Sequence, residues 1–398
     1  MASELQVNTI TEATSGSGIT FAKDIIPATP LSHRNMIING AMQVAQRGTS
    51  STGLGGSSGY FTCDRWRHAF GDTSGRLTSS QDSDAPNGFG NSLKFACTTD
   101  VTAPNIASND YLIIAQKIEG QNLQAFAKGT SDAKAFMVSF YVKGNANATY
   151  VCELYDSDNG RQISKTFNVT TSWSRVELSF PADTTGAFGD DNNTSLNLHI
   201  WLNAGSNYTS QTINSSAWGS GYTNTNRVGS GTTSFFDSTA RTFYITGVQL
   251  ELGSVATPFE HRSYADELQR CQRYYQELSD SSGSFTLPTS YIYGGSGGSS
   301  HAMYVQFLLP VEMRATPDLA FIDSTGSAGT SGGVFTAYGT SHTSGTMPWS
   351  GSPSTGHMSH GKNVYFNMTL SSNAGGGAGD AVLLAVKQNA KVQISAEL

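Results

Sequence analysis

The C-terminal third of the chain combines long loops rich in Gly, Ser and Thr with isolated aromatic residues. The individual candidates for a binding role are Tyr293, Tyr338 and Trp349. Sugars present apolar C–H faces that stack on Tyr and Trp rings, and their hydroxyl groups bond to Asn, Asp and Ser side chains. Because recognition residues concentrate on loops held by a scaffold, these positions predict a receptor-binding site. A place in the core or at a subunit interface is the alternative, and Trp201 and Trp218 are rival candidates.

Three histidines in the same region could bind a metal ion, because imidazole is a common metal ligand. His357 and His360 are separated by two residues, and His342 lies nearby in the sequence. The H-x-x-H spacing is not diagnostic, since no cysteine or acidic residue stands beside the pair. Exposed, solvated histidines are the favoured interpretation, and a metal site is the alternative.

An acidic segment near the middle of the chain is similar to the start of a calcium-binding loop. Residues Asp156 to Gly160 read DSDNG, with carboxylates at the first and third positions. Glycine occupies the fifth position, where a calcium loop needs another ligand. A tight hairpin turn is therefore the favoured prediction. Asp190 and Asp191 form a second acidic loop.

The chain contains no short motif of a known catalytic type. A G-x-S-x-G elbow, an H-E-x-x-H helix and a phosphate-binding glycine loop are all absent from the sequence. The GGSGGSS segment at 294–300 lacks a lysine and a following helix, so a flexible loop is predicted there. Glycan-cleaving enzymes use two carboxylates, but no motif singles out a pair among the 30 acidic residues. The prediction is a protein without catalytic residues.

Charged residues make up only 13% of the 398-residue chain, against about 25% in a typical protein. Yet 37% of the residues are hydrophobic and 10% are aromatic, which is too apolar for a disordered chain. The 43 glycines and many Ser, Thr and Asn residues predict short strands joined by turns. The net charge of -7 argues against nucleic-acid binding, which needs clustered Lys and Arg.

The sequence also predicts no membrane insertion and no disulfides. No apolar run approaches the roughly 20 residues of a membrane helix. The first residues, MASELQVNTITEATSG, lack the basic and apolar regions of a secretory signal. The four cysteines are widely spaced and form no C-x-x-C pair, so reduced, buried thiols are predicted.

Residues 34 to about 262 are predicted to form one all-β domain. Apolar and polar residues alternate there in runs of strand length. The runs are 135–142, 149–155, 162–169, 175–180, 197–202 and 241–252. Turn-forming segments such as KGNAN, DSDNG and PADTTG separate them, and this spacing favours an antiparallel sandwich.

One amphipathic helix is predicted over residues 263–278, within a helical linker that ends near residue 280. Ser263 can cap it, and Asp266 stands at the capping-box position. Its apolar stripe consists of Leu268, Cys271, Tyr275 and Leu278. A single amphipathic helix needs a surface to cover, so it packs either on its own sandwich or on two symmetry mates.

Strand-like segments flank this central part on both sides. Residues 281–398 are predicted to form a second β domain, with strands at 302–309, 364–370, 381–386 and 391–395. Residues 1–33 form a leader with two short alternating segments around Val7 and Ile19. An isolated hairpin is marginal in water, so the leader is expected to pair with other chains or to dock on a neighbour.

Three motifs carry a resemblance to a known class of proteins. They are RNMIINGAMQVAQR at 34–47, FTCDRWRHAF at 61–70, and GVQLELGSVATPFEHRSYADELQRCQRYYQ at 247–276. In this order they resemble segments of bacteriophage tail fibre and other receptor-binding appendage proteins. The stretch from VSFYVKG to TSWSRVELSF, at 138–180, resembles carbohydrate-binding jelly rolls.

This resemblance implies a homotrimeric virion appendage with a jelly-roll β-sandwich, one short helix and a second C-terminal β domain. The leader would attach to other virion proteins, and the far end would bind host surface polysaccharide or lipopolysaccharide during adsorption. Jelly rolls of this class often hold a structural calcium ion, so that ion stays an alternative. A head fibre, decoration protein or tail adaptor is the structural alternative, and a glycan-degrading tailspike is the enzymatic one.

Overall fold

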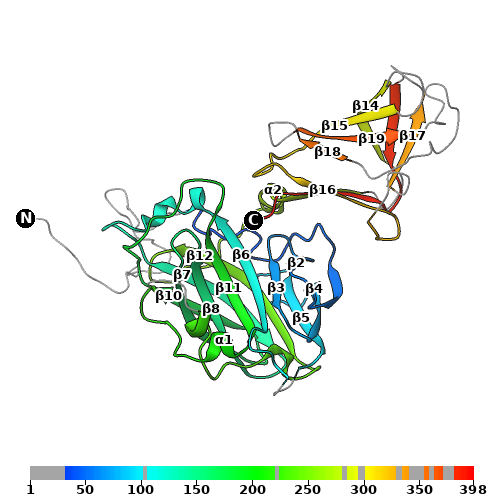
Figure 1. Cartoon of the computed structure of the whole chain (residues 1–398). Helices are drawn as coiled ribbons and strands as arrows, with labels where there is room; N and C mark the ends of the chain where they lie inside the picture. Colours follow the sequence, from blue (N-terminus) through cyan, green and yellow to red (C-terminus); the bar gives the residue numbers. More distant parts are fainter. Residues whose placement is uncertain are drawn as a thin grey trace, which may run out of the picture.

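In the computed structural model, most of the chain is folded into two groups of strands (Figure 1). The described residues are 32–101, 105–219, 224–279, 285–294, 301–328, 334–339, 354–357, 363–370 and 381–398. Residues 1–31 of the leader, with its two expected strands, therefore lie outside this part, as do His342, Trp349 and His360. The domain boundaries at 33, 262 and 280 stay predictions.

Two six-stranded antiparallel sheets form a jelly-roll sandwich, so the all-β prediction is confirmed. The first sheet has the order β1 (Ser50–Leu54), β4 (Arg76–Asp82), β5 (Ser92–Thr99), β12 (Thr242–Leu252), β7 (Phe136–Gly144) and β10 (Ser174–Phe180). The second has the order β2 (Gly59–Tyr60), β3 (Arg67–Gly71), β6 (Tyr111–Glu119), β11 (Thr194–Ala204), β8 (Ala148–Asp156) and β9 (Arg161–Val169). Short helices lie in the connections: η1 (Gly120–Asn122), η2 (Gln124–Phe126), α1 (Ser206–Thr209), η3 (Asn224–Asn226) and η4 (Phe235–Asp237).

The core between the two sheets comes from residues that alternate along each strand. On β7, Phe136, Val138 and Phe140 are all fully buried. Phe126 stacks on Phe136 with ring centroids 4.2 Å apart. Successive side chains of a strand point to opposite faces, so a two-residue period places one set inside. All six strands predicted for residues 135–252 are confirmed.

The first third of the sandwich contains strands that the sequence analysis did not predict. Strands β1 and β4 are rich in Ser and Thr, so their apolar alternation is weak. Polar residues even enter the interior, where the buried Thr62 and Ser79 hydroxyls form a hydrogen bond of 2.9 Å. A buried polar pair is tolerated when it satisfies itself in this way, but it hides the strand from a hydrophobicity pattern.

The three motifs contact one another beside β12, where they have structural roles. The Asn35 amide donates to the carbonyl of Val248 at 3.0 Å, and Val248 N donates to Gly40 O at 3.0 Å. A side chain at Gly40 would overlap the carbonyl oxygen of Val248, so glycine is required there. Trp66 of the second motif donates from its indole to Asn39 O at 3.0 Å.

Helix α2 (Tyr264–Gln272) is shorter than predicted, and the expected end at Leu278 is wrong. Ser263 caps it as predicted and accepts a hydrogen bond from Asp266 N at 3.2 Å. The chain then enters β13 (Tyr275–Ser279), where Tyr275 pairs with Ser395 of the last strand. Pairing with a distant strand thus overrides the local helical pattern. Figure 1 shows α2 between the sandwich and the C-terminal strands.

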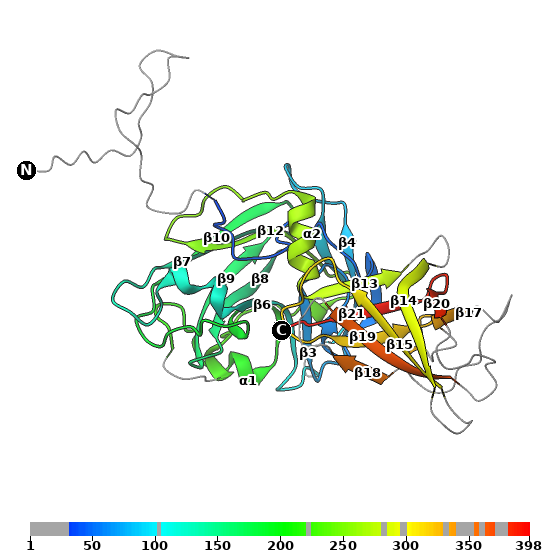
Figure 2. The ribbon, with the colours of Figure 1, turned by 90° about the horizontal axis from the view of Figure 1, so that it is seen from above.

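The C-terminal strands form two further antiparallel sheets to one side of the sandwich (Figure 2). The smaller sheet has the order β13, β21 (Lys391–Ser395) and β16 (Asp318–Ile322). The larger has the order β17 (Phe335–Gly339), β20 (Ala381–Val386), β14 (Phe285–Gly294), β15 (His301–Leu308), β19 (Asn363–Leu370) and β18 (Ser354–His357). The four strands predicted in this region are confirmed.

The four cysteines are free and buried, as the sequence predicts. Burial raises the pKa of every one of these thiols, which keeps them protonated and unreactive. No helix in the described part of the chain has the length and apolar character needed to cross a membrane.

His68 lies in the sandwich core, and neither ring nitrogen has a hydrogen-bond partner among the described residues. Its ring packs against Phe61 and Phe95, with centroids 5.4 and 4.7 Å away. Burial lowers the pKa of His68 from 6.5 to about 3, so the folded state holds a neutral ring. Below pH 6.5 this histidine binds a proton in the unfolded chain but stays neutral in the folded chain. The free energy of unfolding therefore falls as the solution becomes more acidic.

We expect His68→Phe to reduce this acid sensitivity. Between pH 6 and pH 4, the natural chain should lose roughly 1 kcal/mol of unfolding free energy per pH unit at this site. The variant has no group to titrate there, so its loss should be smaller by that amount. Urea unfolding of both proteins at pH 7, 5 and 4 measures the difference, and parallel stability curves would contradict the prediction.

Candidate functional site

The outer face of the second sheet carries aromatic, small and charged side chains that together line a hollow. On β6, Tyr111, Ile113, Ala115 and Lys117 alternate onto this face, while Leu112, Ile114 and Ile118 point into the core. The register sets Ala115 beside Arg67 of β3 on one side and His199 of β11 on the other. Glu153 of β8 follows next to His199. One row across four strands thus reads Arg67, Ala115, His199 and Glu153.

The segment between β11 and β12 folds back over one end of this face. Tyr208 of α1 packs on Trp201 with ring centroids 5.2 Å apart, and on Tyr111 at 5.8 Å. Val228 joins the same apolar cluster. Trp201 is only 1% exposed, so it forms the floor of this end and is not free to stack on a ligand. Tyr111 and Tyr208 are half-buried and form the accessible aromatic surface.

The outer face has a hollow at the point where two alanines lie among larger side chains. Ala69 and Ala115 occupy neighbouring strands between the aromatic end and the charged end of the face. The cavity has a volume of about 230 Å³. It is lined by Arg67, Ala69, Tyr111, Ile113, Ala115, Lys117, His199, Trp201, Tyr208 and Arg227. We call this set of residues the platform.

A buried ion pair fixes one wall of the platform. The Arg227 guanidinium donates to both carboxylate oxygens of Glu153 at 2.6 Å, and its carbon lies 4.7 Å from the centroid of Trp201. Glu153 also accepts from the Trp201 indole at 2.9 Å and from His199 Nδ1 at 2.8 Å. Burial alone would raise the pKa of Glu153, but Arg227 and His199 outweigh it and lower that pKa to about 2. Glu153 therefore stays charged and positions Arg227.

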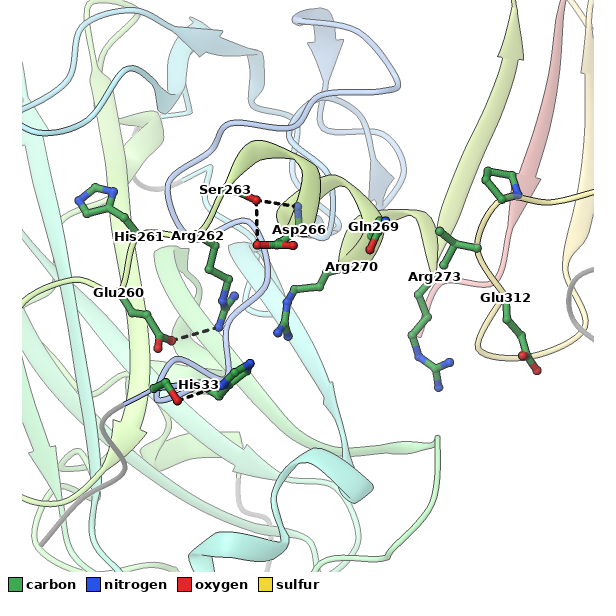
Figure 3. Close-up of a pocket in the computed structure, with 13 residues that line it drawn as sticks. His33, Glu260, His261, Arg262, Ser263, Asp266, Gln269, Arg270, Arg273 and Glu312 are labelled. Carbon is green, nitrogen blue, oxygen red and sulfur yellow. Dashed lines mark hydrogen bonds and ion pairs between the residues drawn. The ribbon is translucent and has the colours of Figure 1, made fainter. Parts of the chain in front are cut away.

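A second, larger cleft of about 810 Å³ lies beside α2 (Figure 3). Arg262, Arg270 and Arg273 contribute to its lining. Arg262 donates to the carbonyl of Ile37 at 2.9 Å, and Arg273 donates to both oxygens of Glu119 at 3.0 and 2.9 Å. Two of the three guanidinium groups are thus used within the chain, and no residue predicted as a site from the sequence lines this cleft.

Two of the three predicted receptor-binding residues of the C-terminal region lie on described strands of the larger sheet. Tyr293 lies on β14, and Tyr338 lies on the edge strand β17. His357 lies on β18, at the opposite edge of the same sheet. Trp349 and His360 are outside the described residues, so binding by Tyr293, Tyr338 and Trp349 stays a prediction. The described part of the chain contains no group of three or more His, Cys, Asp or Glu residues that could hold a metal ion.

The two rival tryptophans are both buried. Trp201 is the platform floor described above. Trp218 is 7% exposed and packs on Phe136 at 5.4 Å, while its indole donates to Pro181 O at 2.9 Å. Trp218 therefore lies in the sandwich core, whereas Trp201 lies buried under the platform on the outer face of the second sheet.

The predicted hairpin turn at Asp156–Gly160 is confirmed, and it joins β8 to β9. Gly160 has a positive φ of 63°, which suits glycine in a tight turn. The Asp156 carboxylate, which would be a ligand in the calcium alternative, is paired with the ammonium group of Lys128. The Lys128 ammonium lies 2.6 Å from Asp156 and 3.1 Å from Asp183, with all three side chains buried.

The platform was missed in the sequence because its parts are far apart along the chain. The alternation from Tyr111 to Lys117 was a usable signal, since its outward residues mix aromatic, small and charged types. The pairing of Glu153 with Arg227 spans 74 residues and has no local signature.

No protein-family profile matches this chain, and no curated protein matches it. Several solved structures match with low similarity. The enzymatically active domain of bacteriophage CBA120 tailspike protein 4 is 13% identical, has a TM-score of 0.29, and the match covers 55% of this chain and 21% of that one. The TmCBM61 module in complex with β-1,4-galactotriose is 11% identical, with a TM-score of 0.28 and coverage of 55% and 99%. The family 11 carbohydrate-binding module from Clostridium thermocellum, in complex with a mixed-linked tetrasaccharide, is 13% identical, with a TM-score of 0.25 and coverage of 54% and 98%.

The matched part of the tailspike domain is thus about a fifth of its length. Similarities at this level assign neither a family nor a function to the chain.

Proposed function

We propose that this protein binds glycans through the platform, as part of a virion appendage that attaches to host cells. The observation that carries the proposal is the pairing of two accessible tyrosines, Tyr111 and Tyr208, with a hollow and fixed polar groups on one sheet face. Tyrosine rings offer a flat apolar surface to a sugar, and the polar groups around them bond to its hydroxyls.

The pre-organised wall strengthens this proposal. Arg227 is held by Glu153 and is only 6% exposed, so this wall of the platform is already ordered before a ligand arrives. Groups whose positions are fixed before binding lose little conformational entropy when a ligand arrives. The platform therefore has the rigid polar elements that specificity requires.

The virion setting is the finer part of the proposal and rests on the three sequence motifs. They resemble appendage proteins of phages, in which a homotrimer attaches by its leader and several weak sites act together. Linked sites raise the effective concentration, so modest single-site affinity suffices for adsorption. A head fibre, decoration or adaptor role without receptor binding is the alternative.

The proposed mechanism is binding without cleavage. Glycan hydrolysis needs a carboxylic acid that can donate a proton beside a second carboxylate. Glu153, the buried carboxylate behind the platform wall, has a pKa of about 2 and is held by Arg227. At neutral pH Glu153 is therefore almost fully ionised and cannot serve as the proton donor. The appearance of new reducing ends after incubation with host polysaccharide would favour the tailspike alternative.

We expect Tyr111→Ala and Tyr208→Ala each to weaken glycan binding about tenfold, as for an aromatic residue at the centre of a binding surface. A panel of bacterial capsular and lipopolysaccharide glycans, titrated against the full-length chain, provides the measurement. Tyr264→Ala is the matched control, because Tyr264 lies on α2 and is 58% exposed. Unchanged affinity in both platform variants, with melting temperatures intact, would move the site elsewhere.

A further inference from the structure

Positive charge gathers at one end of the platform of this acidic protein. The cationic side chains in and around it are Arg65, Arg67, Lys117, Arg227 and Arg314, and the carboxylates there are Glu153 and Glu397. The whole chain has a net charge of -7, so this local excess is opposite in sign to the rest.

Both of these carboxylates are already engaged by other side chains. Glu153 is bound by Arg227, His199 and the Trp201 indole. Glu397 is bound by Arg65, and by Arg47 at 3.2 Å. Arg314 donates to the carbonyls of Ala396 and Asn192, so two of the remaining three cations, both at the rim, are left without a partner of their own in the described part of the chain.

Those two cations are Arg67 and Lys117, which are half-buried and line the hollow. Their side chains make no ion pair or hydrogen bond with any residue that the structure describes. Arg67 is the register partner of Ala115, and Lys117 is two residues further along β6 on the same face. Diagonal neighbours of this kind lie about 7–8 Å apart, close enough to bind one anionic group together.

The surroundings of Lys117 disfavour its protonated, positively charged form as long as no anion is bound. Burial lowers the pKa of Lys117, and Arg67, Arg65 and Arg314 lower it further, against a smaller opposing effect of Glu397. Arg65 also donates to the Lys117 carbonyl at 2.7 Å, which holds this crowded arrangement in place. Two like charges kept side by side without a counter-charge cost stability, and a bound anion would remove that cost.

We propose that the platform selects an anionic glycan, whose carboxylate or phosphate group binds between Arg67 and Lys117 while a sugar ring stacks at Tyr111 and Tyr208. This inference rests on the proposed glycan binding and adds the class of sugar. Arginine binds carboxylate and phosphate groups through paired hydrogen bonds, and lysine adds a point charge. The aromatic end and the cationic end lie on one strand, six residues or about 20 Å apart, so one oligosaccharide can reach both.

The test uses the full-length chain and pairs of oligosaccharides that differ only in charge. Oligomers with uronic acid units are compared with the same oligomers after reduction of the carboxyl groups to alcohols, and phosphate-bearing oligomers form a third arm. The acidic or phosphate-bearing members should bind at least about tenfold more tightly than the reduced ones. Raising the salt concentration should weaken only the charged members.

Variants connect this preference to the two cations. Arg67→Gln and Lys117→Gln should each lose about tenfold in affinity for the charged oligomers and leave the reduced ones unchanged. Arg67→Lys should retain part of the affinity, and Lys134→Gln, at an exposed lysine outside the platform, should change nothing.

Each other outcome has a definite meaning. Equal binding of charged and reduced oligomers, still lost in Tyr111→Ala, would overturn the anionic preference and keep the proposed function. If no glycan binds, both the proposed glycan binding and the anionic preference are contradicted. Equal binding of an oligonucleotide with the same number of charges would also overturn the inference, because a site for any polyanion has no selectivity for sugars.

Discussion

Lys128→Met should lower the unfolding free energy by about 3–5 kcal/mol, as expected when one partner of a buried ion pair is removed. The ammonium group lies 2.6 Å from Asp156 and 3.1 Å from Asp183, and the Lys128 side chain is fully buried. It also donates to the carbonyls of Thr185 and Gly186 at 2.9 and 2.7 Å. Without it, Asp156 remains buried without a cation, and the loops it joins lose their common partner. Thermal and urea unfolding measure the change.

Two further variants separate the ion pair from other effects of substitution. Lys134→Met, at an exposed lysine six residues along the chain, should change stability by less than about 0.5 kcal/mol. Lys128→Met combined with Asp156→Asn should cost less than the sum of the two single changes, because the uncompensated charge is gone. Simple additivity would show that the two residues are not coupled.

Glu397→Gln should destabilise the junction between the sandwich and the C-terminal strands by about 3 kcal/mol. Glu397 makes an ion pair with Arg65, whose side chain is only 1% exposed. The carbon of the Arg65 guanidinium lies 3.5 Å from the ring centroid of Tyr274, and Arg47 lies at the same distance from Tyr275. Neutralising Glu397 leaves the Arg65 charge buried and weakens the attachment of the last strand.

The loss should be visible as faster proteolysis of the C-terminal strands, together with a lower melting temperature. Glu312→Gln is the matched control, because Glu312 is exposed and forms no ion pair with the described residues. Proteolysis at the natural rate in Glu397→Gln would mean that the junction does not depend on this contact.

These contacts also explain the structural role of the three sequence motifs. Arg47 ends the first motif, Arg65 belongs to the second, and the two tyrosines belong to the third. The motifs therefore hold the sandwich to the C-terminal strands, and the surface proposed to bind glycans lies outside most of their length.

The sequence by itself determined the strands whose pattern is local. Phe136, Val138 and Phe140 alternate with outward residues, and a two-residue period identifies a strand without knowledge of its partners. The hairpin turn at 156–160 was likewise predictable, because glycine at the fifth position favours a turn. The all-β class and the cap at Ser263 followed from information of the same short range.

Only the tertiary structure decided where distant segments meet. Helix α2 ends at Gln272 because Tyr275 pairs with Ser395, and strand pairing over this distance leaves no trace in the local pattern. The platform joins Tyr111, Trp201 and Arg227 from three separate segments, and Lys128 finds Asp156 across 28 residues. Local propensity reports on neighbours along the chain, whereas burial and charge pairing depend on neighbours in space, so a site built by packing could be seen only in the folded molecule.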